Sequence, residues 1–543
     1  MFPARRILKL SFLGGAAVGG VGYAVNQFGD PDSIGIIRFG RAATTVLDIA
    51  RLYRRTIYAK EYDVQSAEYK ELRSQVHYEA AEKLLDLCRK NKGMFVKVGQ
   101  HIGALEYLLP AEYVQTMKVL HSKAPDSSLK DILKVIKQEF GKDPADIFEE
   151  FSEEPIGVAS LAQVHIARLK PQEGEKKGEL LAVKVQHPTV KFNADADLKT
   201  MEFLVKVVSW AFPDFKFMWV VDETKKNIPK ELDFYLEGQN AEKARTMFAS
   251  YPWLKIPKVF WNLTTSRVLT MEYVEGAGQV NDLEYIRREG IDPYLVASRL
   301  GNIYSEMIFK NGFVHSDPHP GNILVRKRKG KLMGDVELVL LDHGLYADLT
   351  DNFRATYSRL WMHILNGNPA GMRKEGVALG IAEPLYALFA CMVSGRKWES
   401  INRGLEVTKF TASEKHDFQK EIPHLLPQIT DVLATVDRQM LLILKTNDLL
   451  RGIEYTLRTH TRMGSFRVMA DLCVKSYYQE RLMNSKSKWE TMKISLEFYW
   501  AVVRLYAYYA VLPLMISRPT FPSLKDVIRN ALRPGIIPGI LPS

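Results

Sequence analysis

The chain has 543 residues, of which 46% are hydrophobic and 25% charged. It is long enough for one large globular unit with extensions. Its cysteines, Cys88, Cys391 and Cys473, are widely spaced and odd in number, which excludes a disulfide framework and a CxxC metal site. The formal net charge of +11 is spread along the chain rather than gathered in one tract, so no nucleic-acid partner is expected.

The first 29 residues include Arg5, Arg6 and Lys9 but no acidic residue, and an apolar, glycine-rich run extends from Leu10 to Val25. An acid-free basic start is typical of mitochondrial import signals. The run is slightly shorter than the ~20 residues that span a bilayer. A secretory signal peptide fits the same physics, but the lack of a disulfide framework favours mitochondria. We therefore expect residues 1–30 to target the chain to mitochondria and anchor it at the inner membrane.

Residues 31–152 are predicted to form helices, with a break at Asn91–Gly93. Apolar residues recur at helical spacing before the break. After it, Lys97 and Gln100 stand three positions apart on a helix that is otherwise largely apolar. A lysine in that setting is usually a surface residue whose stem covers apolar neighbours, so the pattern alone assigns Lys97 no function.

A strand-rich lobe is predicted over residues 153–275. Leu180–Val185 is an apolar strand with one lysine, Lys184, facing the other way. A lone strand lysine is usually a solvated edge residue, so its meaning depends on the rest of the chain. In the following segment Asp233 and Glu237 are four residues apart and are predicted to share one helix face. Val268–Val274 is predicted to be a further strand that runs into a hinge.

A second lobe is predicted over residues 276–470, and its centre carries the clearest chemical signature. Residues 315–322 are His-Ser-Asp-Pro-His-Pro-Gly-Asn, and 25 positions after Asp317 an apolar strand runs into Asp342-His343-Gly344. Asp317 and Asn322 have the spacing of a catalytic-loop carboxylate and a metal ligand. Asp342 opens a DxG triplet of the kind that holds Mg²⁺ in kinases. Chance accounts for either piece alone but hardly for both.

These motifs indicate phosphoryl transfer from ATP with Mg²⁺, a reaction that depends on positioning and charge neutralisation. Asp317, Lys184 and Glu237 are the predicted catalytic residues, with Lys184 on the α- and β-phosphates and Glu237 as its ion-pair partner. The predicted metal ligands are Asn322 and Asp342. The backbone near Glu272 and Val274 is expected to meet adenine.

The sequence after Asp342 lacks the long activation segment ending in Ala-Pro-Glu with which protein kinases hold peptides. Instead Thr350 and Asp351 precede an apolar-periodic run, which predicts a helix start. His343 also replaces the phenylalanine of the protein-kinase DFG triplet. A peptide substrate is therefore not expected.

With these motifs in order, the chain resembles the aarF-domain-containing, or UbiB-type, atypical kinases over roughly residues 75–350. The most specific features are the KxGQ motif at Lys97–Gln100 and the ExD motif at Glu231–Asp233. Within that family the chain looks most like a mitochondrial subgroup, on its N-terminus and the stretch Asn447–Arg451. The resemblance implies an α+β fold of the bilobal, atypical protein-kinase-like type, with an N-terminal helical KxGQ extension and extra C-terminal helices.

The resemblance also implies roles for further residues. In the family an alanine-rich loop covers the nucleotide, and the matching cofactor-binding positions here are Gly157, Val158, Ala159 and Ser160. This chain departs from the family pattern by having Gly157 and Val158 where alanines are usual, and such a glycine is expected to relax the backbone over the phosphates. Lys97, Gln100, Glu231 and Asp233 would be regulatory, because in the family the KxGQ lysine points into the site toward the ExD carboxylates and excludes protein substrates.

Near the other end, residues 498–516 are almost wholly apolar and rich in Tyr and Trp, but they include Arg504 and Pro513. This composition fits a bilayer interface or a packed helix better than a lipid-facing span, and a core helix closing the second lobe remains an alternative. Residues 471–543 are expected to be helices followed by a proline-containing tail from 517.

Two interpretations of function remain open at this point. The first is a mitochondrial Mg-ATP-dependent kinase or ATPase that acts on a membrane lipid or isoprenoid-quinone-type molecule, as the resemblance implies. The second is a catalytically weak nucleotide-binding scaffold that maintains inner-membrane structure through protein partners. The full set of predicted site residues favours the first.

Overall fold

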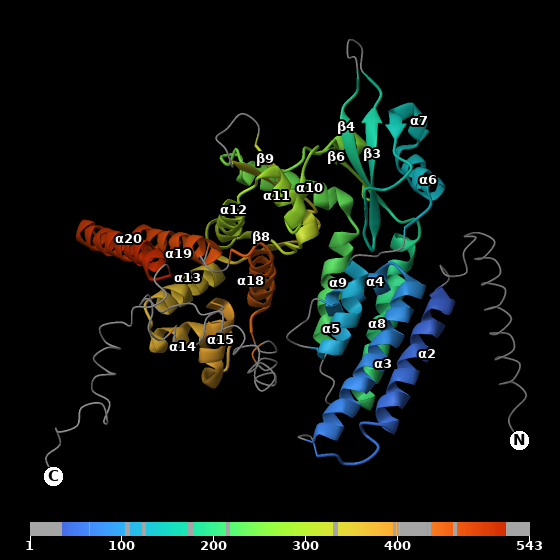
Figure 1. Ribbon diagram of the computed structural model, residues 1–543, viewed down its shortest axis with the longest axis horizontal. Coiled ribbons are helices and arrows are strands. Elements are labelled where there is room, and N and C mark those ends of the chain that lie inside the picture. Colours follow the sequence, from blue (N-terminus) through green and yellow to red (C-terminus); the bar gives the residue numbers. More distant parts are fainter. Residues whose placement is uncertain are drawn as a thin grey trace, which may run out of the picture. The chain divides into compact units, whose positions relative to one another are not determined.

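The computed structural model describes residues 35–516, apart from 64–65, 104–108, 122–125, 172–176, 213–217, 329–334, most of 395–435 and 460–463. The expected targeting segment and the tail after 516 lie outside the described residues. The chain divides into two compact units, coloured along the sequence in Figure 1. Unit 1 comprises residues up to Gln279 with Gly321–Gly330 and Glu337–Tyr346, and unit 2 comprises Val280–Pro320, Lys331–Val336 and residues from Ala347 onward.

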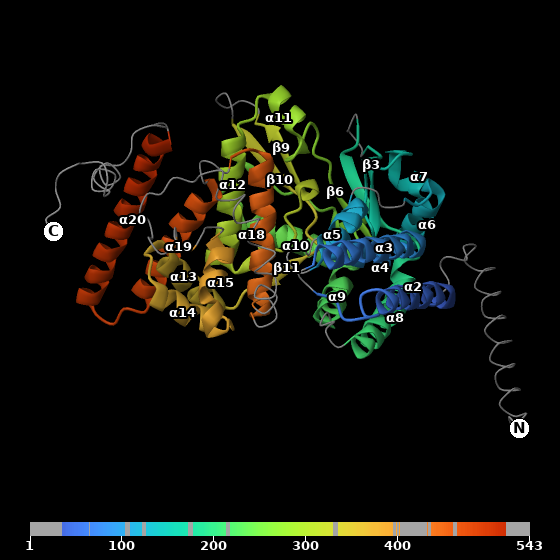
Figure 2. The same ribbon diagram turned by 60° about the horizontal axis from the view of Figure 1, so that its bottom comes forward.

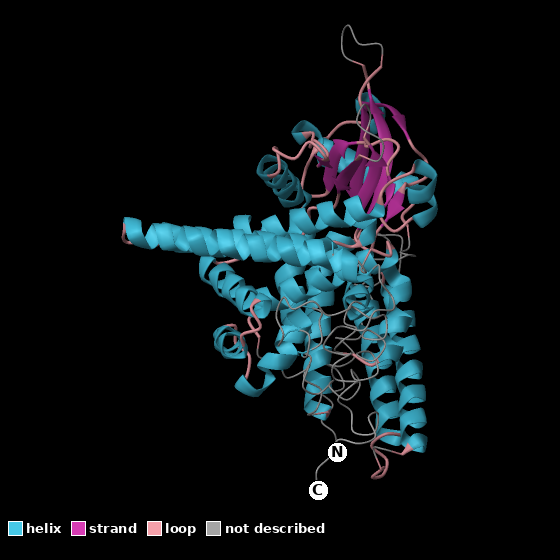
Figure 3. Ribbon diagram, turned by 60° about the vertical axis from the view of Figure 1, so that its left-hand side comes forward, coloured by secondary structure: helices cyan, strands magenta, loops and turns pink. Residues whose placement is uncertain are grey.

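This division differs from an expected lobe boundary at residue 275. The helical extension and the first lobe together form unit 1, and two segments that follow Pro320 join it. The strands gather in unit 1, whereas unit 2 is almost wholly helical (Figure 3). The α+β class expected from the sequence is confirmed.

The helical part of unit 1 holds α2 (Gly35–Arg55), α3 (Ala67–Asn91), α4 (Met94–Gly103), α5 (Ala111–Met117), α8 (Val190–Ala211) and α9 (Met218–Glu231). The predicted break after α3 is confirmed, since Lys92 and Gly93 both have positive φ, at 55° and 49°. A Cβ added to Gly99 would lie 2.4 Å from Leu120 and 3.1 Å from Cys88. The glycine of the KxGQ motif therefore lets α4 close on this small core.

The main sheet of unit 1 is antiparallel, in the order β1 (Phe148–Phe151), β3 (Ala162–Leu169), β4 (Leu180–Gln186), β6 (Val268–Glu272), with β2 (Gly157–Val158) paired to β3. Register places Lys184 between Val164 on β3 and Leu269 on β6. Helix α6 (Leu129–Phe140) presents Ile132, Val135 and Ile136 to one apolar cluster with Leu181 and Val183. On the other side α10 (Phe234–Met247) packs along β6.

One sequence prediction was wrong here. Phe148–Phe151 was expected within the helical stretch 31–152, but it forms β1 and pairs with β3. Phe148 is buried in the cluster of α6 and the sheet, and Phe151 packs against the same cluster. Burial of these rings, which depends on the sheet, outweighs the helical pattern of the preceding residues.

A second sheet has the order β5 (Leu254–Lys255), β10 (Val336–Leu340), β9 (Ile323–Lys327), β7 (Gly278–Gln279). The amide of Leu341 donates to the carbonyl of Asn322 over 2.8 Å. This bond brings the residue before β9 beside the residues that follow β10, and these are the two places where metal ligands were predicted.

Unit 2 is built from α11 (Leu283–Glu289), α12 (Pro293–Glu306), α13 (Asp351–Leu365), α14 (Pro369–Ala378), α15 (Tyr386–Ser394), α18 (Arg438–Thr456), α19 (Gly464–Met483) and α20 (Lys488–Ile516). Its core contains the buried rings of Tyr304, Tyr357 and Trp361. The predicted helix start at Thr350 is confirmed, because its side chain accepts a hydrogen bond from the amide of Phe353. Among the described residues no helix has an apolar stretch long enough to cross a bilayer.

Candidate functional site

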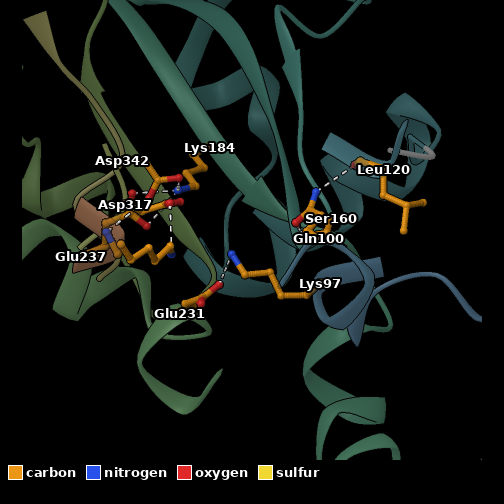
Figure 4. Close-up of polar contacts among 11 residues, drawn as sticks. Lys97, Gln100, Leu120, Ser160, Lys184, Glu231, Glu237, Asp317 and Asp342 are labelled. Carbon is orange, nitrogen blue, oxygen red and sulfur yellow. Dashed lines mark hydrogen bonds and ion pairs between the residues drawn. The ribbon is translucent and has the colours of Figure 1, made fainter. Parts of the chain in front are cut away.

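Lys184 and Glu237 form the centre of the candidate site. Strand β4 buries Val183 and Val185 on the sheet's packed side, so the alternate residue, Lys184, projects the other way. Its Nζ lies 2.7 and 2.9 Å from the two carboxylate oxygens of Glu237 on α10 and 3.5 Å from Oδ2 of Asp342. Figure 4 shows the lysine between these carboxylates. The pairing of Lys184 with Glu237 expected from the sequence is present.

Burial and the neighbouring charges together shift the pKa values of Lys184 and Glu237. Burial alone lowers the pKa of Lys184, but the carboxylates of Asp342 and Glu237 outweigh it, and the pKa of the ammonium group lies above its ordinary value. Burial raises the pKa of Glu237 to about 7, with Lys184 opposing the shift and Asp342 adding to it. The side chain of Glu237 is 3% exposed and that of Asp342 is 43% exposed. Asp342 is therefore the carboxylate of the cluster that is open to a ligand.

The DxG triplet has an unusual backbone. Asp342 has φ 51°, a left-handed conformation that non-glycine residues adopt at a cost and that is concentrated at functional sites. The amide of Gly344 donates to Oδ1 of Asp342 over 3.3 Å, and a Cβ at Gly344 would lie 3.2 Å from that oxygen. The carbonyl of the intervening His343 accepts a hydrogen bond from Asn240 of α10. Helix α10 thus holds both Glu237 and the triplet.

The imidazole of His343, which stands where protein kinases have phenylalanine, is buried. Its ring is bonded to the hydroxyl of Tyr346 and to the carbonyl of Leu340 at 2.9 and 3.1 Å, and it stacks on the Tyr346 ring. These bonds join the triplet to its own flanking residues.

Asn322 and Asp342 supply an amide and a carboxylate oxygen at neighbouring backbone positions, since Asn322 and Leu341 share a hydrogen bond. Such hard oxygen donors suit Mg²⁺, which takes one or two protein ligands and completes its shell with phosphate oxygens and water. The described residues contain no cluster of three or more His, Cys, Asp or Glu able to hold a metal by themselves. The two oxygen donors fit a Mg²⁺ ion that is also bound by nucleotide phosphates.

The predicted nucleotide loop lies between β2 and β3. Ala159 is held at both backbone groups, because its amide donates to Ala162 and its carbonyl accepts from Nε2 of His187 over 3.0 Å. Gly157 belongs to β2, a Cβ there would have no neighbour within 4 Å, and its φ is not positive. Gly157 therefore has an ordinary strand conformation, and Val158 continues the same strand.

The predicted hinge follows β6. The carboxylate of Glu272 pairs with Lys255 at 2.6 Å, and the Glu272 amide donates to the carbonyl of Lys258. That amide is therefore unavailable to adenine. The amide of Val274 makes no hydrogen bond to any residue that the structure describes, so of the two predicted positions Val274 offers the donor.

The KxGQ and ExD motifs contact each other through Lys97 and Glu231, whereas Asp233 has another role. Nζ of Lys97 on α4 lies 2.6 Å from Glu231 at the end of α9, and the two side chains are 17% and 7% exposed. Asp233 instead caps α10 by accepting from the amides of Tyr235 and Leu236. The chain leaves α9 at Glu231 and begins α10 at Phe234, so Asp233 and Glu237 do not share one continuous helix. That part of the prediction was wrong.

Gln100 contacts two other segments of unit 1. Its Nε2 donates to the carbonyl of Leu120 over 3.0 Å, and its Oε1 accepts from the hydroxyl of Ser160 over 3.2 Å. Figure 4 shows this residue reaching the nucleotide loop. Gln100 thus joins the KxGQ helix to the loop, a role that the sequence motif did not indicate.

Asp317 lies in unit 2, two residues after the end of β8 (Phe313–His315). The amide of His319 donates to the Asp317 carbonyl over 2.7 Å, which closes a tight turn. His315 is buried, with its Nδ1 3.1 Å from the Tyr304 hydroxyl. The turn therefore follows a residue that is buried in the core of unit 2, and the side chain of Asp317 is 36% exposed.

Sequence reasoning missed one residue beside Asp317. Nζ of Lys445 on α18 lies 3.5 Å from Oδ1 of Asp317. Helix α18 is held by Asn447, which donates to the hydroxyl of Tyr357, and by Arg451, which donates to the last carbonyls of α15. On sequence grounds the stretch Asn447–Arg451 indicated only a resemblance to a subgroup of the family. No local pattern could have paired Lys445 with an aspartate so far away in the chain.

Comparison with known proteins agrees with this geometry. Residues 119–375 match the model of the ABC1 atypical kinase-like domain. The chain is 53% identical to AarF domain-containing kinase 1 of Drosophila melanogaster, over 96% of this chain and 99% of that protein. It is 47% identical to AarF domain-containing protein kinase 1 of Gallus gallus, over 91% and 92%. It is 35% identical to the ABC1 family protein MCP2 homolog of Schizosaccharomyces pombe, over 81% and 79%.

Proposed function

Because the chain belongs to the ABC1, or aarF-domain, family of atypical kinases, we propose that it is a Mg-ATP-dependent phosphotransferase or ATPase. Its place would be the mitochondrial inner membrane and its substrate a membrane lipid or isoprenoid-quinone-type molecule. A kinase-like domain implies nucleotide binding in general. The observation that carries the proposal is Lys184, held between Glu237 and Asp342.

Each residue of the proposed site has a separate role. Lys184 would bind the nucleotide phosphates, and Glu237 keeps its ammonium group oriented. Asp342 and Asn322 would hold Mg²⁺, which neutralises charge on the phosphates when it is bound. Asp317 would orient the accepting hydroxyl or water of the substrate. Val274 would supply the amide for adenine.

The ion pair of Lys97 and Glu231 supports the exclusion of protein substrates. Both side chains are largely buried, and removing one partner from a buried pair costs about 3–5 kcal/mol. Helix α4 is therefore expected to stay in place during turnover. The chain also enters α13 soon after the DxG triplet, without room for the segment on which protein kinases bind peptides.

The membrane part of the proposal has different support. The basic, acid-free start and the apolar run from Leu10 to Val25 favour a mitochondrial membrane. The lipid or isoprenoid quinone as substrate comes from the family resemblance alone. The alternative is a nucleotide-binding scaffold that maintains inner-membrane structure through protein partners.

Thermal unfolding with Mg-ATP, with ATP plus chelator, and with neither tests the nucleotide site, since a specific ligand raises the melting temperature by mass action. We expect a magnesium-dependent rise in the wild type that Asp342→Asn abolishes. Asp195→Asn, an exposed carboxylate on α8, is the matched control and should behave as wild type. Equal shifts in wild type and Asp342→Asn would contradict the metal assignment.

Turnover then separates the enzyme from the scaffold. Mg-ATP hydrolysis by the purified full chain, measured with lipid extracts added, should be detectable and should be lost in Asp317→Asn. A normal Mg-ATP thermal shift without any turnover would favour the scaffold. Lipid mass spectrometry of the protein with and without ATP identifies the substrate class, and release or modification of a bound lipid on ATP addition is the expected result.

A further inference from the structure

Helix α20 carries a continuous row of large apolar side chains that the described residues of unit 2 leave exposed. The row consists of residues spaced alternately three and four apart along five helical turns, all between 47% and 73% exposed: Trp489, Met492, Leu496, Tyr499, Val503 and Tyr506, with Trp500 beside them. Residues at this spacing share one helix face. Single exposed apolar residues are ordinary, but a contiguous patch of this size marks an interaction surface.

The opposite face of α20 is occupied, which fixes the orientation of the row. Ile494 and Leu505 are buried, and Phe498 packs its ring 5.7 Å from Tyr478 on α19. Arg481 of α19 also pairs with Glu497 at 2.6 Å. Figure 2 shows α20 lying beside α19 at the edge of the helical unit. The helix is thus not the fully packed core helix that remained an alternative on sequence grounds.

The composition of the row distinguishes between possible partners. A helix that spans a bilayer would need a longer and more apolar stretch than the described part of α20 provides. A coiled coil with a second copy would use this spacing, but its seam is normally aliphatic, whereas here four of the seven residues are Trp or Tyr. Amphipathic rings of this kind are enriched at the interface of lipid bilayers, where the ring is buried and its polar atom stays hydrated.

Charge complements the apolar row. Lys486 lies just before the helix, Lys488 and Lys493 lie in its first two turns, and Arg504 lies farther along it. The two acids of the helix are both occupied, because Glu490 accepts from the amide of Lys486 and Glu497 is paired with Arg481 on the α19 side. Lysine and arginine beside an exposed aromatic face are typical of helices that lie in the interface of anionic membranes.

We propose that α20 docks on an anionic lipid surface through the face that runs from Trp489 to Tyr506. The helix lies in the plane of the interface, with its rings among the headgroups and α19 on its far side. This surface is independent of nucleotide use, because none of its residues belongs to the proposed site.

Local fluorescence on the full-length protein tests the docking directly. Cys88, Cys391 and Cys473 are all buried, so a cysteine introduced at an exposed position can be labelled selectively. Val503→Cys and Val377→Cys form a matched pair in unit 2, since the two valines are 57% and 49% exposed but lie on α20 and α14. Each is labelled with an environment-sensitive dye and mixed with phosphatidylserine-containing vesicles whose acyl chains carry bromine.

The dye at position 503 is expected to shift to the blue and to be quenched by brominated chains, whereas the dye at 377 should do neither. Adding Leu496→Glu to the labelled Val503→Cys protein should bring the quenching down to the level at 377. Because the readout is local, an anchor elsewhere in the chain does not produce it. Magnesium-dependent thermal shifts with ATP should be the same in all these variants, which separates this test from that of the nucleotide site.

Three outcomes would overturn the proposal. A blue shift at 503 without vesicles that grows with protein concentration would assign the face to a second copy of the chain. Equal responses with neutral phosphatidylcholine vesicles would overturn the assignment to an anionic surface. No response with either kind of vesicle would show that α20 does not meet lipid.

Discussion

The hydroxyl of Ser160 donates a hydrogen bond to Oε1 of Gln100 over 3.2 Å. Through this bond, and a second one from Gln100 to the Leu120 carbonyl, the KxGQ helix holds the loop proposed to cover the nucleotide phosphates. Gln100 of the KxGQ motif therefore holds the nucleotide loop through Ser160, although the sequence assigns the two residues to separate motifs.

Gln100→Ala is expected to loosen that loop. Losing the two hydrogen bonds and leaving their partners inside the protein should lower the free energy of unfolding by about 1–3 kcal/mol, and the loop should bind Mg-ATP more weakly. Chemical denaturation and the Mg-ATP thermal shift measure the two effects. Gln138→Ala, at a more exposed glutamine of α6, is the control. If both variants behave alike, Gln100 does not brace the site.

The buried pair of Lys97 and Glu231 is expected to show strong coupling. Lys97→Glu places two carboxylates together and should destabilise by about 3–5 kcal/mol, and Glu231→Lys added to it should recover much of that loss. Reversing the exposed pair Lys83 and Glu79 on α3 should have little effect. Unfolding free energies, ATP turnover and autophosphorylation are measured across both cycles. Purely additive effects at Lys97 and Glu231 would mean that the charges do not interact.

Glu237 predicts a particular dependence of stability on pH. Burial raises the pKa of Glu237 to about 7 in the folded protein, from an ordinary glutamate value of 4.5, so between these pH values the folded state binds more protons than the unfolded state. The contribution of Glu237 to stability is therefore present at low pH and is lost as the pH rises through 7, with a slope of up to about −1.4 kcal/mol per pH unit.

Glu237→Gln should remove that component, so the slope of unfolding free energy against pH between 5 and 7 becomes less negative than in the wild type. Urea titrations at several pH values provide the slope. Identical slopes in both proteins would show that Glu237 does not titrate in this range. The variant should also be less stable overall, because Lys184 loses the partner that lies 2.7 Å away.

Lys445 is predicted to position the carboxylate of Asp317. Lys445→Met should lower kcat on the order of 10- to 100-fold, as expected for a misplaced catalytic group, with little change in KM for ATP. Lys445→Arg should recover part of the rate, since it restores the positive charge. Lys475→Met, which removes an exposed lysine of α19, should leave the rate unchanged. A Lys445→Met protein as active as the Lys475→Met control would contradict the role.

The N-terminal segment makes a prediction about location. Residues 1–30 fused to a fluorescent protein should enter mitochondria, because the segment is basic, acid-free and followed by an apolar run. The full-length protein should resist carbonate extraction. A fusion found in the endoplasmic reticulum would contradict import, and complete release by carbonate would contradict an integral anchor.

Much of the candidate site could be predicted from the sequence because its chemistry follows local rules. The spacing of Asp317, Asn322 and Asp342 is set by one loop and one hairpin, and the projection of Lys184 follows from the alternation of a strand. The choice of Glu237 as the partner of Lys184 was also correct. Each of these inferences needed only neighbouring residues, or a motif whose internal geometry is constant.

Other features depended on contacts between segments far apart in the chain, and these only the tertiary structure decided. The cap at Asp233, the bond from Gln100 to Ser160 and the approach of Lys445 to Asp317 each require two elements to pack in one register. Phe148 and Phe151 became a strand because a sheet was present to bury them. The exposed face of α20 could not be predicted from the sequence. Helical spacing shows which residues share a face, but which face is buried depends on the elements that pack against the helix.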